Sequence, residues 1–185
     1  MENGLQSYLR FLEGEQAAFK TVVKLYWDSM LLFTNGYVHN LSDAEDIAQE
    51  ALIKLSIKRP KLLHENQLKA YLFKICRNTA INHLKKQKRL TDMSQELTEN
   101  IEDQMQEIES RMELKDSAQL LHRAMQKLKQ EYREILYLRY FEQLTIPECA
   151  KIMKCSERQA TAIGYQARQT LRKILEKEGY SVENL

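Results

Sequence analysis

Apolar residues recur along most of the chain at steps of three and four residues, the spacing of one face of an α-helix. One such stretch covers residues 19–30, a second covers 42–55, and a third runs from about 67 to 84 or beyond. Helices with one apolar face are stable only when those faces pack together. The pattern therefore predicts a helical bundle over roughly residues 1–90.

The pattern then changes. Residues 91–117 have no apolar stripe and are rich in Glu, Gln, Asp and Ser, a composition typical of a flexible acidic linker. Apolar periodicity resumes after it, and the chain holds only five Gly and two Pro. The sequence predicts an all-α protein of two small helical bundles, at 1–90 and 118–178, joined by the flexible acidic linker 91–117.

Capping signals place the starts of three helices. Ser42-x-x-Glu45, Thr145-x-x-Glu148 and Ser156-x-x-Gln159 each have the spacing of a capping box. The last two boxes begin helices at about 146–154 and 156–176, joined by a tight turn at Lys154-Cys155. We interpret this pair as a helix-turn-helix, whose second helix would enter a major groove, with an ordinary helical hairpin as the alternative.

Charge is unevenly distributed. Residues 68–90 hold seven basic and no acidic residues, whereas 91–117 hold nine acidic and two basic ones. Basic groups neutralise phosphates, and aromatic and amide side chains can hold unstacked bases. The segment 68–90 is therefore a candidate nucleic-acid surface. The acidic stretch 43–50 could be a protein-docking surface or a solvated helix face.

Several classes of function are not expected. Residues 1–20 lack the layout of a signal peptide, and no run of about 18 apolar residues predicts a membrane helix. The three cysteines show no C-x-x-C spacing, which is typical of a cytoplasmic protein. The histidines have no metal-binding spacing, and no Gly-rich phosphate loop occurs. We expect no cofactor, no metal site, no catalytic residues and no membrane insertion.

Three segments together resemble one known family. DAEDIAQEALIKL (43–55) closely resembles the core-polymerase-binding segment of extracytoplasmic-function sigma factors, a subfamily of the sigma-70 family. LKAYLFKICRNTAINHLKKQKR (68–89) resembles the segment that melts and reads the −10 promoter element. The C-terminal segment 132–175 is similar to the region that binds the −35 element. The three segments occur in the family's order and spacing, and the resemblance, with the variable linker included, extends over nearly all of the chain.

The resemblance implies a sigma factor that directs core RNA polymerase to specific promoters, with promoter DNA and an anti-sigma factor as further partners. It implies core polymerase binding by Asp43, Asp46, Gln49 and Glu50. It implies −10 DNA binding by Tyr71, Arg77, Asn78, Asn82, Lys85, Lys86, Lys88 and Arg89. It implies −35 DNA binding by Glu157, Arg158, Gln159, Thr161, Ala162 and Arg168.

The chain departs from the family most in the last helix. Where the family usually shows V-K-[ST]-R-L-x-R-A-R, residues 160–168 are ATAIGYQAR, which lacks two or three of the expected cations. Gly164 also lowers helix propensity by about 1 kcal/mol. Two other functions stay open. One is a sigma-like polymerase-binding regulator with degenerate −35 recognition. The other is a promoter-specific repressor or activator, which would not need the acidic segment 43–50.

Overall fold

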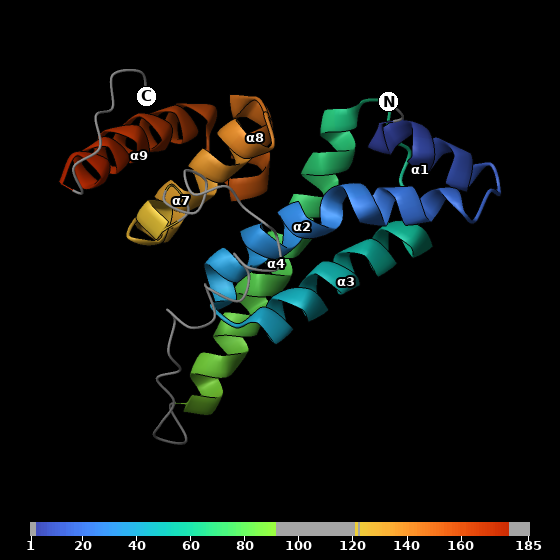
Figure 1. Ribbon diagram of the computed structural model, residues 1–185, viewed down its shortest axis with the longest axis horizontal. Helices are drawn as coiled ribbons and strands as arrows, with labels where there is room; N and C mark the ends of the chain where they lie inside the picture. Colours follow the sequence, from blue (N-terminus) through green and yellow to red (C-terminus); the bar gives the residue numbers. More distant parts are fainter. Residues whose placement is uncertain (1–2, 92–120, 122, 178–185) are drawn as a thin grey trace. The chain divides into compact units, whose positions relative to one another are not determined.

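The computed structural model describes residues 3–91, 121 and 123–177, and each element within these ranges is helical (Figure 1). The all-α prediction is therefore confirmed. The chain divides into two compact units, Met1–Ile108 and Glu109–Leu185, and the division falls within the segment predicted as a linker. Apart from residue 91, that segment lies outside the described residues, so its flexibility and the boundaries 1–90, 91–117 and 118–178 stay predictions.

Within residues 3–91, the first unit forms α1 (Gly4–Leu12), α2 (Ala18–Val38), α3 (Leu41–Lys58) and α4 (Glu65–Thr91). Helix α2 packs against the other three, and α3 also packs against α4. The apolar face predicted for 42–55 is buried throughout, and it comprises Ala44, Ile47, Ala48, Ala51, Leu52 and Leu55. None of the described helices combines the length and apolar character that crossing a membrane requires.

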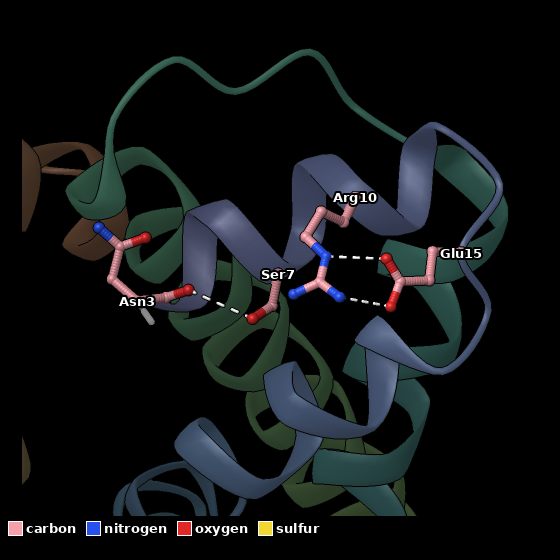
Figure 2. Close-up of polar contacts among 4 residues, drawn as sticks. All are labelled: Asn3, Ser7, Arg10 and Glu15. Atoms are coloured by element: carbon pink, nitrogen blue, oxygen red, sulfur yellow. Dashed lines mark hydrogen bonds and ion pairs between the residues drawn. The ribbon is translucent and has the colours of Figure 1, made fainter. Parts of the chain in front are cut away.

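Helix α1 was missed by the apolar periodicity, although its cap is legible in the sequence. The Asn3 side chain accepts a hydrogen bond from the Gln6 N–H (2.8 Å), and the Gln6 side chain accepts one from the Asn3 N–H (3.2 Å). Figure 2 shows Arg10 and Glu15 paired across the turn that follows α1, with Arg10 Nε 2.8 Å from a carboxylate oxygen. These local contacts define both ends of a short helix whose apolar pattern is too brief to stand out.

Helix α1 is attached to the chain that leads into α4. The Tyr8 hydroxyl donates to the carbonyl of Pro60 (2.8 Å), and the Glu65 carboxylate accepts from the Leu5 N–H (2.8 Å). The Arg59 guanidinium lies 5.0 Å from the ring centre of Phe11. The start of α4 is therefore held by α1 as well as by the bundle.

The predicted start of α3 at Ser42 is wrong. The helix begins at Leu41, and the side chain of Asn40 accepts a hydrogen bond from the Asp43 N–H (2.9 Å). Asn40 has an extended backbone, with φ −144° and ψ 122°, as an N-cap residue requires. Asparagine caps a helix as well as serine does, so the two candidate caps could not be separated by residue type.

The second unit contains α7 (Gln130–Leu136), the π-helical turn η1 (Tyr137–Phe141), α8 (Ile146–Met153) and α9 (Glu157–Lys177). Helix α9 packs against both α7 and α8. The η1 turn continues α7 with wider winding, which leaves Leu138 buried while Tyr140 and Phe141 face outward.

Helices α8 and α9 form the predicted helix-turn-helix, with both predicted capping boxes. The Glu148 carboxylate accepts from the Thr145 N–H (2.7 Å), and the Gln159 side chain accepts from the Ser156 N–H (2.9 Å). Lys154 ends α8 in the left-handed conformation, with φ 58°. Such a conformation costs a non-glycine residue roughly 1–2 kcal/mol, which the packed helices on either side can offset.

Candidate nucleic-acid interface

Helix α4 carries most of its predicted DNA-binding residues on one face. Tyr71, Asn78, Asn82, Lys85 and Arg89 follow one another at steps of seven, four, three and four residues, so their side chains share one side of the helix. Tyr71 and Asn78 are half-buried, whereas the other three are exposed. The face therefore changes along the helix from an aromatic ring and an amide to exposed cations.

The remaining predicted residues lie at the edges of this face. Lys86 and Lys88 are exposed, and Arg77 is half-buried. On the opposite side of α4, Leu68, Leu72, Phe73, Cys76 and Ala80 are fully buried. The buried side fixes the rotation of the helix and thereby the direction in which the polar face points.

Cys76 belongs to the packed side of this helix. Its thiol is fully buried, and burial raises its pKa to about 12. Cys149, in the second unit, is likewise buried, and its pKa is also raised to about 12. Both thiols therefore stay protonated near neutral pH, which favours a packing role over a redox role.

Past Ala80, α4 has no buried residue: positions 81–90 are half-buried or exposed. In Figure 1 this part of α4 extends beyond the ends of α2 and α3. Four cations, Lys85, Lys86, Lys88 and Arg89, are exposed along it. A projecting helix with this charge can approach a phosphate backbone without displacing the rest of the bundle.

The predicted docking residues divide between two directions. Asp46 and Gln49 are exposed on α3, and the half-buried Glu50 forms an ion pair with Lys54. Asp43 instead turns toward α4, where its Oδ2 atom lies 3.1 Å from His83 Nε2. The structure therefore brings Asp46, Gln49 and Glu50 together and places Asp43 at the contact between two helices.

Two residues next to the docking positions were missed. Ile53 and Ile57 are 48% and 69% exposed, and they lie seven and eleven residues after Asp46, on the same side of α3. The signal in the sequence is a pair of isoleucines that lie outside the apolar stripe of this helix, at helical spacing from Asp46. Exposed isoleucines beside carboxylates are suited to a protein partner, because DNA-binding surfaces are basic and polar.

The six predicted −35 residues are all exposed on α9. Three of them also bond within the protein: Gln159 caps the helix, the Thr161 hydroxyl donates to the Glu157 carbonyl (2.8 Å), and Arg168 Nη1 donates to the Tyr140 hydroxyl (3.3 Å). Ala160, Ala167 and Leu171 form the opposite, buried side. The arrangement leaves Arg158 as the exposed cation in the first turn.

Tyr165 was missed on this face. It is 59% exposed, and it lies on the same side of α9 as Thr161 and Arg168, at steps of four and three residues. Helical spacing from the chosen residues would have found it. Tyr165 lies within residues 160–168, where the cations expected from the family are absent. It therefore places a large aromatic side chain on the exposed face of α9.

The described residues contain no group of three or more side chains suited to hold a metal ion. The described surfaces differ in character: α4 presents a basic face with amides and an aromatic ring, α3 presents an acidic and apolar face, and α9 presents an exposed, mainly polar face.

Comparison with known proteins finds two family matches. Residues 31–90 match the model of sigma-70 region 2, and residues 118–171 match the model of sigma-70 region 4. The first range includes α3 and nearly all of α4, and the second includes α7, α8 and most of α9.

Curated proteins of similar sequence include three bacterial sigma factors. The RNA polymerase sigma-H factor of Pseudomonas aeruginosa is 30% identical over 183 residues, which is 95% of each chain. The sigma factor SigV of Bacillus subtilis is 32% identical over 78% of this chain and 83% of its own. The ECF sigma-E factor of Escherichia coli K12 is 28% identical over 88% of each.

Two solved structures share the fold. The sigma factor RpoE of Bartonella quintana, in complex with the anti-sigma factor NepR, superposes with a TM-score of 0.66 at 21% identity, covering 85% of this chain and 96% of its own. CnrH in complex with the cytosolic domain of CnrY superposes with a TM-score of 0.58 at 18% identity, covering 94% and 95%.

Proposed function

Because this chain belongs to the extracytoplasmic-function subfamily of the sigma-70 family of bacterial RNA polymerase sigma factors, we propose how its surfaces divide that work. The chain is a transcription initiation factor that directs core RNA polymerase to promoters. We place its action in the cytoplasm and assign it no catalytic step of its own. What we propose is which residues bind core polymerase and which bind promoter DNA.

The observation that supports the proposal is that the first unit presents two surfaces of different chemical character. Helix α3 presents carboxylates beside exposed isoleucines, and α4 presents amides, an aromatic ring and cations. A protein partner suits the first face and nucleic acid suits the second. A single rigid bundle can thereby hold polymerase on one side and promoter DNA on the other.

Core polymerase docks, in this proposal, on Asp46, Gln49 and Glu50 of α3. Ile53 and Ile57 extend the same surface, since apolar area beside charged groups adds affinity while the charges select the partner. Asp43 was expected in this set by resemblance. Its carboxylate faces α4, where it lies beside His83.

The −10 element binds along α4. Asn78 and Tyr71 lie at the half-buried end of the polar face, where an unstacked base can be held by an amide and an aromatic ring. Asn82 lies one turn beyond Asn78. Lys85, Lys86, Lys88 and Arg89 follow the DNA backbone, with Arg77 at the edge of the face.

The −35 element binds the exposed face of α9. Arg158 lies in the first turn, where an arginine can pair with base edges and free backbone N–H groups can meet a phosphate. Glu157, Gln159, Thr161 and Ala162 complete the first turns. Arg168 lies farther along the same helix, and its contact with Tyr140 restrains it for a backbone contact.

A second function of the C-terminal unit is favoured by one observation. The stretch from Ala160 to Ala167 carries no charged side chain, although several of its residues are exposed to solvent. A sigma factor that binds polymerase through the first unit, with weakened −35 recognition in the second, would have this helix. The alternative of a promoter-specific repressor or activator that acts without polymerase has no such support, because the chain belongs to a family of sigma factors.

We also infer an anti-sigma partner. The two solved relatives described above are each in complex with another protein, in one case named as an anti-sigma factor. The exposed aromatic residues Tyr140 and Phe141 and the isoleucines of α3 give such a partner apolar area on both units.

Transcription in vitro tests the proposed function directly. Purified core polymerase is combined with the full chain and a promoter template, and run-off transcripts are measured against core alone. We expect transcripts that depend on both the chain and the promoter sequence. Transcription that is independent of the chain would refute the initiation role, and transcripts that ignore a scrambled −35 box would favour the second function.

A further inference from the structure

A polar contact continues the packing of α4 beyond its last buried apolar residue. Ala80 is the last fully buried residue of the helix, and the same side continues at His83 and Gln87, three and seven residues later. His83 Nε2 lies 3.1 Å from Asp43 Oδ2, and Gln87 Nε2 donates to the same oxygen across 3.4 Å. One carboxylate on α3 therefore meets two successive turns of α4.

Asp43 is itself firmly placed. It lies in the first turn of α3, and its N–H is bonded to the Asn40 side chain, so its backbone is part of a capped helix end. Its side chain is 26% exposed and that of His83 is 30% exposed. A side chain that starts from a fixed backbone and is partly shielded from water can restrain the partner that it contacts.

The turns that Asp43 contacts are those that carry the cations. Lys85 and Lys86 lie between His83 and Gln87, and Lys88 and Arg89 follow at once. No residue of this stretch is buried, and its one apolar side chain, Leu84, is only half-buried, so apolar packing holds the stretch less firmly than the rest of α4. Helix ends without packing fray, and a frayed end would spread its charges over many positions.

We propose that Asp43 is a positioning residue of the DNA-binding surface. By binding His83 and Gln87, it holds the projecting end of α4 in one direction, so that the four cations meet the phosphates in a fixed arrangement. The inference rests on the proposed −10 role of α4, and it gives Asp43 a purpose other than docking polymerase. It also places the start of α3 in contact with the DNA-binding part of α4.

Whether replacing Asp43 weakens or strengthens DNA binding distinguishes a positioning role from electrostatic repulsion of the DNA. An acidic residue beside a DNA-binding surface repels phosphates, so its removal alone should strengthen DNA binding. Asp43→Ala removes the charge and also the hydrogen-bond acceptor, whereas Asp43→Asn removes the charge and keeps an acceptor oxygen. If Asp43 positions α4, the alanine variant binds promoter-fork DNA about two- to fivefold more weakly than wild type, and the asparagine variant binds at least as tightly as wild type.

The partner residue supplies a second pair of variants. His83→Gln keeps a donor nitrogen near the place of Nε2, and His83→Ala keeps none. We expect near-wild-type binding from the first and weaker binding from the second. The double variant of Asp43→Ala with His83→Ala should bind no more weakly than Asp43→Ala alone, because Asp43→Ala already removes the contact that His83→Ala would remove. Asp28→Ala, an exposed aspartate of α2, is the matched control and should leave binding unchanged.

Each variant is assembled with core polymerase, and the affinity of that complex for fork-junction DNA is measured. Urea unfolding of each variant alone shows whether the first unit stays folded. Failure of the wild-type complex to bind fork DNA would refute the proposed function itself. If wild type binds, the inference is overturned by an Asp43→Ala variant that equals or exceeds Asp43→Asn. Additive losses in the double variant would overturn it as well.

Discussion

The hydroxyl of Tyr26 lies where a side chain on Gly4 would have to be. A Cβ atom on Gly4 would stand 2.1 Å from the Tyr26 hydroxyl oxygen and 2.5 Å from two ring carbons, far inside contact distance. Tyr26 is only 4% exposed, so the ring has little room to retreat. Its hydroxyl has no hydrogen-bond partner among the described residues. Glycine at this position is what lets α1 lie against α2.

Gly4→Ala should therefore lower the free energy of unfolding by about 1–3 kcal/mol, the usual cost of forcing extra volume into a packed contact. Tyr26→Phe should be neutral or slightly stabilising, because it removes a buried hydroxyl that lacks a partner. Urea unfolding followed by circular dichroism measures both. A loss of more than about 1 kcal/mol in Tyr26→Phe would mean that the hydroxyl has a partner and that this account of the contact is wrong.

The helical elements could be predicted because apolar spacing and caps act locally. The boxes at Thr145 and Ser156 needed only residues three positions apart, and both are present. The start of α3 was mispredicted because Asn40 and Ser42 are both good caps, and the choice between them depends on how the chain enters the helix. Helix α1 was missed although Leu5, Tyr8, Leu9 and Leu12 have helical spacing, because a segment of nine residues shows that spacing over only two turns.

The surfaces were predicted less completely, because exposure depends on packing between helices. Asp43 and Asp46 look equivalent in the sequence, yet only the fold shows that α4 lies beside Asp43. Ile53, Ile57 and Tyr165 were passed over because apolar residues at helical spacing usually belong to a core. Their helical spacing from the predicted site residues was the available signal, but their exposure follows from which side of each helix the neighbouring helices cover.

The glycine in α9 and the glycine that follows α1 should respond to alanine in opposite ways. A Cβ on Gly164 would meet Ile135 Cγ1 at 3.6 Å, an ordinary contact, so Gly164→Ala should raise the free energy of unfolding by about 0.5–1 kcal/mol through helix propensity. Gly14 has φ 109°, so Gly14→Ala should lower it by about 1–2 kcal/mol. Urea unfolding measures both. Because Gly164 faces α7, weakened −35 binding in Gly164→Ala would contradict its assignment to the packed side.

Charge reversal on α3 tests the docking surface. Asp46→Lys, or Gln49→Ala combined with Glu50→Lys, should weaken binding to core polymerase by about tenfold while leaving the helix content unchanged, because these side chains make few contacts with the bundle. Affinity is measured with labelled protein and purified core. Asp28→Lys on α2 serves as the matched control. Equal affinity of the double variant and the control for core would remove these residues from the docking surface.

Salt dependence tests the phosphate contacts of α4. Replacing Lys85, Lys86, Lys88 and Arg89 by alanine should weaken fork-DNA binding and reduce the slope of log K against log salt by about 0.7–0.9 for each phosphate that is no longer neutralised. Asn78→Ala should instead reduce discrimination between −10 sequences with little change in slope, since an amide reads bases and neutralises no charge. Binding titrations at several salt concentrations measure both. Full −10 discrimination in Asn78→Ala would rule out a base-reading role for that residue.

Helix α9 is where the sequence departs most from its family. Arg158 is exposed in the first turn of α9, and the next cation along the exposed face is Arg168, which is restrained by the Tyr140 hydroxyl. Recognition that rests on so few groups should be sensitive to each of them, because one bidentate pair between arginine and a base contributes about 1–3 kcal/mol. Arg158→Ala should therefore reduce transcription from a −35-dependent promoter by about tenfold, and Lys177→Ala, at the far end of α9, should not reduce it. The assay compares run-off transcription from templates with intact and scrambled −35 boxes. If scrambling and Arg158→Ala both leave the output unchanged, α9 does not read the −35 element. The exposed aromatic residues of this unit would then point to a protein partner as its ligand.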